Sequence, residues 1–240
     1  NGNEGGWNTA LDNEFARWDT QQRPLIHPWG LFGGINTAHY EPLNCCAGRF
    51  FNGTDVFMPT EFLHGLYDGG AGAGLNDWWN KMLDNPLSAG GFIWAFADEG
   101  IVRADQNGKI DVAGNRAPDG IVGPYREKEG SFFAIKEIWS PVYFPLSEQE
   151  QLPENFAGKL WVENRYEFTN LNQLQFTWKL INFPQLGANA ENAVSFGEGK
   201  IKSPSVFPGQ RGQLEIDLPT GWQQADAFYL RATNVQGEEI

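Results

Sequence analysis

Cysteine, methionine and histidine are scarce in this chain of 240 residues, which has two cysteines, two methionines and three histidines. The two cysteines, Cys45 and Cys46, are adjacent, and adjacent cysteines rarely pair with each other because the ring they would close is strained. The chain has no second cysteine pair that could complete a zinc site, so we expect reduced thiols that hold no metal. The two cysteines do not indicate whether the protein works in an oxidising or a reducing compartment.

Positive charge is also in short supply. Seventeen lysines and arginines stand against thirty aspartates and glutamates, which gives a net charge of −13 and a pI near 4.6. Such a field repels phosphate backbones, so we expect no nucleic-acid partner. No apolar run reaches membrane-spanning length, so we expect no membrane association. No signal peptide is recognisable, although residue 1 does not resemble a natural start.

Aromatic side chains, by contrast, are plentiful. They make up 14% of the chain, including 10 tryptophans and 18 phenylalanines. Flat rings stack on the CH faces of sugars, and they also fill large cores. The excess therefore shifts the balance only slightly toward a carbohydrate site.

The first part of the chain alternates short strands with helices. Apolar residues at helical spacing predict one helix through Leu75, Trp78, Trp79 and Met82 and an earlier one through Leu11, Phe15 and Trp18. Residues 131–139 read as a further helix, and residues 98–126 as a long irregular stretch. Short strands are predicted in the segments RPLIHPW, GINTAHY, DVFMPTEF and AGGFIWAFA.

Strands that alternate with helices indicate βα units and a parallel sheet. In a βα-barrel the active site lies at the carboxyl ends of the strands. About five strands are recognisable against the eight of a full barrel, so residues 1–144 are predicted to form the C-terminal half of a (β/α)8 TIM barrel.

Residues 145–240 have a different pattern. Segments such as KLWVENRYEF and LQFTWKLI alternate apolar and polar residues and are separated by polar turns. This pattern predicts an immunoglobulin-like β-sandwich. The expected fold class is therefore α/β plus all-β.

Glu4 and Glu61 are the candidate catalytic pair. Each ends a predicted strand and has polar or aromatic neighbours. Glycoside hydrolysis uses two carboxyl groups, one that protonates the leaving oxygen and one that attacks the anomeric carbon or activates water. The alternative is that both are ordinary solvated acidic residues among thirty.

The surrounding motifs strengthen the catalytic interpretation. GNEGG and PTEFLHG resemble the two catalytic signatures of glycoside hydrolase family 2, the family of β-galactosidases, β-glucuronidases and β-mannosidases. AGGFIWAFADEG is similar to the family's eighth-strand segment, and residues 119–144 to the stretch that follows it. The order of the motifs is preserved over most of the chain.

The resemblance implies a role for each matching residue. Glu4 would be the acid/base and Glu61 the nucleophile of a retaining mechanism. Asn3 would bind the sugar 2-hydroxyl, and Tyr40 would orient the nucleophile. The ring of Trp94 would form the floor of the sugar site. The resemblance also places His64 near the sugar, and His27 sits at a predicted strand end where it would line the pocket. His39 is left out, because it would point to the opposite face from Tyr40 in a regular strand.

The resemblance favours β-galactosidase activity on the non-reducing end of an oligo- or polysaccharide. A β-glucuronidase is disfavoured because Ala117 stands where that subgroup has a lysine after Asn115, although Arg116 is a neighbouring substitute. Other plant- or algal-glycan specificities and a non-catalytic carbohydrate-binding or structural fragment are the remaining alternatives. The segment DQNGKID has a loose calcium-loop spacing, but an Asn-Gly hairpin turn explains it better.

No metal or cofactor is expected within this chain, and any magnesium would belong to the full-length enzyme. Half a barrel leaves open sheet edges, so the missing N-terminal part of the same enzyme is an expected partner. Whether the enzyme forms a homo-oligomer is left open. The family resemblance favours a periplasmic or secreted location over a cytoplasmic one.

Overall fold

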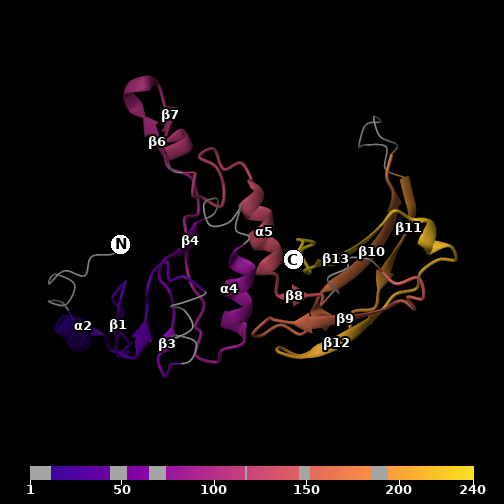
Figure 1. The fold of residues 1–240 in the computed structure, drawn as a ribbon, viewed down its shortest axis with the longest axis horizontal. Helices are drawn as coiled ribbons and strands as arrows, with labels where there is room; N and C mark the ends of the chain where they lie inside the picture. The colour runs from indigo at the N-terminus through magenta and orange to yellow at the C-terminus, as the bar shows by residue number, and fades with distance from the viewer. Residues whose placement is uncertain (1–11, 44–52, 65–73, 117, 146–151, 185–193) are drawn as a thin grey trace. The chain divides into compact units, whose positions relative to one another are not determined.

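The computed structural model describes residues 12–43, 53–64, 74–116, 118–145, 152–184 and 194–240. The chain divides into two compact units, Asn1–Trp139 and Ser140–Ile240 (Figure 1). Among the described residues, small β-sheets dominate and helices are few. No helix in these ranges has both the length and the apolar character that crossing a bilayer requires.

The first unit contains short strands, helices and one hairpin. In chain order its elements are α2 (Asp12–Trp18), β1 (Leu31–Phe32), β2 (Ile35–Asn36), β3 (Val56–Phe57), β4 (Phe62–His64), α4 (Gly74–Leu83), β5 (Ile93–Trp94), β6 (Gly100–Arg103), β7 (Lys109–Val112) and α5 (Gly130–Ile138). Strand β2 runs parallel to β3, and β4 runs parallel to β5. Parallel strands need a crossover connection, and α4 lies between β4 and β5 as such a connection.

Prolines make the strands of this unit shorter than the sequence predicts. The segment RPLIHPW forms no strand, and β1 begins only at Leu31. Pro24 and Pro28 remove backbone donors from that segment, which a sheet ladder would need. The predicted strand DVFMPTEF is likewise divided into β3 and β4, with Pro59 between them.

Helix α4 supplies much of the core of the first unit. Its residues Leu75, Trp78 and Met82 are buried, as their helical spacing predicts. The ring of Trp78 stacks on Phe57, with centroids 6.1 Å apart, and meets Phe62 edge-on at 5.9 Å. These contacts pack α4 against β3 and β4.

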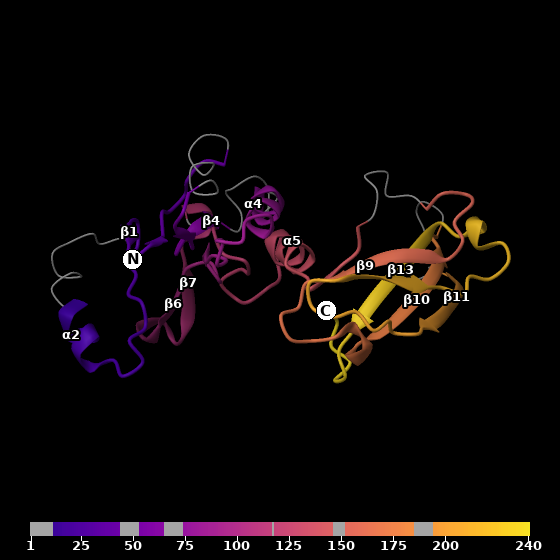
Figure 2. The same ribbon diagram turned by 90° about the horizontal axis from the view of Figure 1, so that it is seen from below.

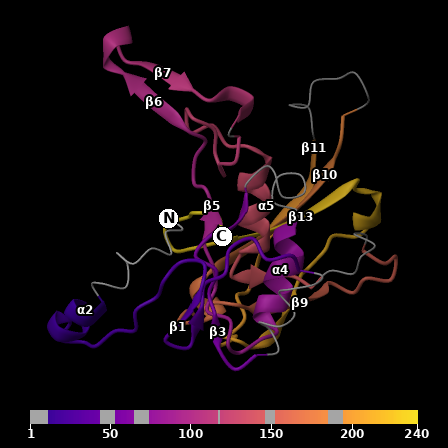
Figure 3. The same cartoon turned by 60° about the vertical axis from the view of Figure 1, so that its left-hand side comes forward.

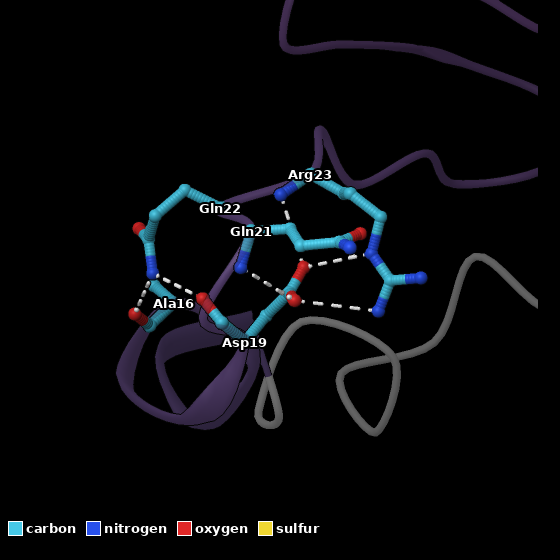
Figure 4. A network of polar contacts seen from close by, with 5 residues as sticks. All are labelled: Ala16, Asp19, Gln21, Gln22 and Arg23. Atoms are coloured by element: carbon cyan, nitrogen blue, oxygen red, sulfur yellow. Dashed lines mark hydrogen bonds and ion pairs between the residues drawn. The ribbon is translucent and has the colours of Figure 1, made fainter.

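Helix α2 forms, but its apolar face is not buried. The predicted helix is present from Asp12 to Trp18, but Phe15 and Trp18 on its apolar face are 56% and 70% exposed. Polar contacts surround the C-terminal end of α2 (Figure 4). Asp19 binds the backbone and guanidinium of Arg23, and Gln22 donates to the carbonyl of Ala16. The hydrogen bond from Arg23 lowers the pKa of the Asp19 carboxyl.

Residues 98–126 are not uniformly irregular, because β6 and β7 form an antiparallel hairpin (Figure 3). Asn107 and Gly108 take positive φ values of 55° and 80° at its turn, which confirms the predicted Asn-Gly turn. Arg103 pairs with both Asp105 and Asp111 at 2.6 and 2.8 Å. The carboxylates of the loose calcium pattern are therefore held by an arginine across the hairpin.

The second unit is built from two three-stranded antiparallel sheets (Figure 2). One sheet has the order β11-β10-β13 and the other β12-β9-β8. The strands are β8 (Val142–Tyr143), β9 (Lys159–Asn164), β10 (Gln175–Asn182), β11 (Val194–Ile201), β12 (Arg211–Glu215) and β13 (Ala227–Thr233). Both sheets contribute to one buried cluster, with Val162 and Leu214 from one sheet and Phe176 and Leu180 from the other. The alternation seen in the sequence thus buries one face of each strand.

A glycine on β11 makes room for a core tryptophan. Gly199 lies opposite Trp178 in the ladder. A Cβ at position 199 would come within 2.7 Å of the Trp178 indole nitrogen. The glycine therefore lets a large ring lie flat against the neighbouring strand.

Glu163 on β9 is the centre of a charged cluster on the other sheet. It accepts hydrogen bonds at 2.8 Å from Arg165 and from Arg211, and the Arg165 guanidinium lies 3.7 Å from the centroid of the Tyr143 ring. Burial opposes ionisation of Glu163, but the hydrogen bonds from the two arginines outweigh it and lower the pKa of this carboxyl.

We expect Glu163→Gln to reduce the free energy of unfolding of this unit by about 1 kcal/mol at pH 7. Because the folded-state pKa is depressed, the ionic stabilisation is fully present above the unfolded pKa and is lost as the pH falls through the folded pKa. Denaturant melts of the two proteins should therefore differ at pH 7, and the difference should shrink as the pH falls below the ordinary pKa of a glutamate. A difference that is independent of pH would mean that packing, not charge, is lost. Glu215→Gln, a glutamate on β12 with an exposed side chain, is the matched control.

Candidate active site

Glu61 lies in a bend directly before β4, just beyond the carboxyl end of β3. Tyr40 follows the carboxyl end of β2 in the same way. Because β2 and β3 are adjacent and parallel, their ends meet at the same edge, which brings these two residues together although they are 21 positions apart. The side chain of Glu61 is 15% exposed.

Tyr40 donates a hydrogen bond to Glu61. The distance from the phenol oxygen to Oε1 is 2.7 Å. A hydrogen bond donated to a carboxylate is stronger than one between neutral groups and holds the carboxylate in one orientation. The structure thus joins two residues that the sequence analysis placed in one site.

His39 approaches the other oxygen of Glu61. Its Nδ1 lies 3.8 Å from Oε2, and its Nε2 lies 2.7 Å from the Thr60 hydroxyl. The ring is packed against Trp29, with centroids 4.9 Å apart. Burial lowers the pKa of His39, although the neighbouring Glu61 charge opposes this shift.

The strand alternation that excluded His39 from the site is absent from the structure. Strand β2 ends at Asn36, and Tyr40 takes a positive φ of 50°. The alternation of a regular strand therefore does not apply, and both His39 and Tyr40 reach Glu61. The feature that identifies His39 is its closeness to Glu61. That closeness depends on the path of the loop after β2, which the sequence does not show.

Strained backbone gathers around this site. Trp29, Tyr40 and Leu63 have φ values of 70°, 50° and 53°, in a region that residues other than glycine rarely adopt. Such conformations cost free energy and cluster at active sites, where the surrounding structure holds them in place. Here they flank the glutamate on both sides in sequence.

Trp94 ends β5, the strand beside β4. Its indole N–H donates to Asp119 Oδ2 at 3.1 Å, and the backbone N–H of Ala95 donates to the carbonyl of Asp119 at 3.0 Å, an ordinary hydrogen-bond distance. Asp119 itself is 8% exposed. This carboxylate fixes the edge of the indole ring, and the sequence analysis did not single it out.

The remaining candidates are placed only in part. Asn3 and Glu4 lie outside the described residues, as does the side chain of His64, whose backbone belongs to β4. His27 lies with its Nε2 3.0 Å from Asp12 Oδ2 and its ring edge-on to Phe32. Its predicted role in the pocket stays a prediction, and so does the pairing of Glu4 with Glu61.

Metal-binding chemistry finds no support in the part of the chain that the structure describes. No group of three or more histidine, cysteine, aspartate or glutamate side chains there is arranged to hold an ion. Cys45 and Cys46 lie outside the described ranges.

We expect Tyr40→Phe to lower the rate of any reaction that uses Glu61 as a nucleophile by about 10- to 100-fold, because one charge-assisted hydrogen bond is lost. The measurement is kcat on an aryl glycoside, with thermal melting to check the fold. Tyr125→Phe, at an exposed tyrosine, serves as the control. An unchanged kcat would show that the phenol hydroxyl does not assist Glu61.

Comparison with known proteins finds similarity to one family of enzymes. Residues 160–239 match the family model described as β-galactosidase, domain 4. Over 181 residues the chain is 25% identical to a β-galactosidase of Pseudoalteromonas haloplanktis, covering 71% of this chain and 16% of that protein. The chain is similar to β-galactosidases over these stretches.

Two further β-galactosidases show similarity to the chain. A β-galactosidase of Oenococcus oeni is 24% identical over 257 residues, which covers 95% of this chain and 23% of that protein. A β-galactosidase of Priestia megaterium is 22% identical over 173 residues, covering 64% of this chain and 16% of that protein. The chain thus spans about a sixth to a quarter of the length of these curated relatives.

Proposed function

We propose that this chain is part of a retaining exo-β-glycosidase that removes terminal β-galactosides. The observation that carries the proposal is the hydrogen bond from Tyr40 to Glu61 at the ends of two parallel strands. The names of the relatives support the substrate class. Their greater length supports the view that the chain works as a segment of a longer enzyme.

In the proposed mechanism Glu61 is the nucleophile and Glu4 the acid/base. Glu61 attacks the anomeric carbon while Glu4 protonates the leaving oxygen, and a covalent glycosyl-enzyme forms. Glu4 then acts as a base on the water that attacks the same carbon, which restores the configuration. Asn3 binds the sugar 2-hydroxyl, and Trp94, steadied by Asp119, forms the floor of the sugar site. His27 and His64 line the pocket.

The proposed architecture is the second half of a (β/α)8 TIM barrel in residues 1–144, followed by an immunoglobulin-like β-sandwich in residues 145–240. Two observations support the barrel. The strand pairs β2–β3 and β4–β5 are parallel, and α4 connects β4 to β5. Glu61, Tyr40 and Trp94 all lie at or beyond the carboxyl ends of strands, where barrel enzymes carry their sites.

The test is a panel of aryl glycosides with the full-length enzyme. We expect cleavage of the β-galactoside. NMR of the released sugar should detect the β-anomer as the first product. A 2-fluoro-galactoside inactivator should leave its mass on the peptide that contains Glu61. Release of the α-anomer would mean inversion, with carboxyl groups about 6.5–9.5 Å apart in place of about 5–5.5 Å. Preference for a glucuronide would replace the proposed sugar, and failure to cleave any glycoside would favour a carbohydrate-binding or structural role.

A further inference from the structure

The ring of His39 is buried and is held by contacts with Thr60 and Trp29. Its side chain is 2% exposed, its Nε2 bonds the Thr60 hydroxyl at 2.7 Å, and Trp29 packs against its face. The Nδ1 atom is buried and makes no hydrogen bond within the described residues. It faces Glu61 Oε2 at 3.8 Å. A buried polar atom that makes no hydrogen bond reduces the stability of a fold. The position of Nδ1 next to Glu61 therefore calls for a functional explanation.

The neighbours of the ring determine which nitrogen carries the proton. A lone pair on Nδ1 would face the negative carboxylate of Glu61, whereas an N–H there is attracted to it. Nε2 is then the acceptor, and the Thr60 hydroxyl donates to it. Thr60 and Glu61 are adjacent in sequence, so one segment supplies both the donor to the ring and the carboxylate that the ring faces.

We propose that His39 is a positioning residue for Glu61, which orients the second carboxylate oxygen while Tyr40 holds the first. This inference rests on the proposed role of Glu61 as nucleophile. The terminal torsion of a glutamate is broad and has no sharp preferred angle. Two N–H or O–H groups that approach different oxygens remove that freedom and hold the carboxylate plane in one orientation. At 3.8 Å the two atoms are beyond hydrogen-bond distance, so in this structure Nδ1 acts on the carboxylate through electrostatic attraction.

The charge state of the ring agrees with this role. Glu61 and Tyr40 are the titratable groups in contact with it among the described residues. Burial lowers the pKa of His39, so the ring is neutral around pH 7. A neutral N–H orients the carboxylate without forming an ion pair that would reduce its nucleophilicity.

The first experiment compares two substitutions in the full-length enzyme. In His39→Asn the side-chain amide keeps an N–H near the position of Nδ1, whereas His39→Leu keeps the bulk and removes it. We expect His39→Leu to lower kcat about 10- to 100-fold, with KM within about twofold of the wild type, and His39→Asn to recover most of the loss. Thr60→Val should reproduce part of the loss and Thr60→Ser none.

Equal losses in His39→Leu and His39→Asn, or a normal kcat in both, would overturn the inference. Glu61→Gln in the same assay separates this failure from failure of the proposed function. If Glu61→Gln is inactive and His39→Leu is fully active, only the role of His39 is wrong. If Glu61→Gln keeps its activity, the proposed nucleophile is wrong.

The second experiment needs no activity and uses the unaltered protein. Nitrogen-15 NMR of histidine-labelled enzyme distinguishes the two neutral tautomers, and the His39 signal is identified by its loss in His39→Asn. We expect the proton on Nδ1 at pH 7. A proton on Nε2, or a charged ring at that pH, would overturn the proposal even if the leucine variant failed to fold.

Discussion

Glu61→Gln is expected to lower kcat/KM for a β-galactoside by at least about 1,000-fold, because the amide cannot attack the anomeric carbon. The isosteric change leaves the position of the side chain and its contact with Tyr40 largely intact, so the loss reports on chemistry. The measurement is initial-rate kinetics on a nitrophenyl galactoside with the full-length enzyme. Thermal melting should show a change of only a few degrees.

A second variant at this position identifies the role of Glu61 more closely. Glu61→Ala leaves space for a small external nucleophile, and azide should restore turnover and yield the α-galactosyl azide. That product forms because azide attacks from the side that the carboxylate occupied. Glu137→Gln, an exposed glutamate on α5, is the control and should keep wild-type activity. Loss of activity without azide rescue and with normal melting would point to a role other than nucleophile.

Asn164→Ala is expected to reduce the free energy of unfolding of the second unit by about 3 kcal/mol. The Asn164 side chain is fully buried and makes three hydrogen bonds. Its amide donates to the carbonyls of Thr169 and Val206, both at 2.8 Å, and its Oδ1 accepts from the backbone N–H of Tyr166 at 3.0 Å. Truncation removes all three hydrogen bonds, and of the three backbone groups the Val206 carbonyl keeps the bond that it accepts from the Leu171 N–H at 3.1 Å.

The measurement is a denaturant or calorimetric melt, in which the transition of this unit should fall by about 10 °C or more. Asn172→Ala, at an exposed neighbouring asparagine, should change stability by less than about 0.5 kcal/mol. Asn164→Asp keeps the shape but turns an oxygen toward two carbonyls, so it should be at least as destabilising at pH 7. A small effect in both Asn164 variants would mean that water replaces the side chain.

Local sequence signals determined several elements of this protein. The spacing of Leu75, Trp78 and Met82 predicted α4 and its buried face, because helical periodicity places these residues on one side. Asn107 and Gly108 predicted the hairpin turn, because both residues tolerate positive φ. The alternation in residues 159–182 predicted strands β9 and β10.

Other features depended on the path of the chain in three dimensions. Phe15 and Trp18 have helical spacing, yet nothing in that pattern specifies what would cover them, and both are exposed. His39 and Asp119 reach Glu61 and Trp94 across 22 and 25 positions of sequence. Their contacts follow from where loops return after each strand, and the residue types alone do not determine that path.

The sequence by itself thus determined the periodic helices, the turn and the chemical character of the Glu61 segment, because these depend on neighbours within a few residues. Only the tertiary structure decided which polar groups meet. It placed Tyr40 and His39 on the two oxygens of Glu61, Asp119 on the indole of Trp94 and three backbone groups on Asn164. Those contacts arise from the packing of parallel strand ends and of two facing sheets, which fixes distances that no local pattern contains.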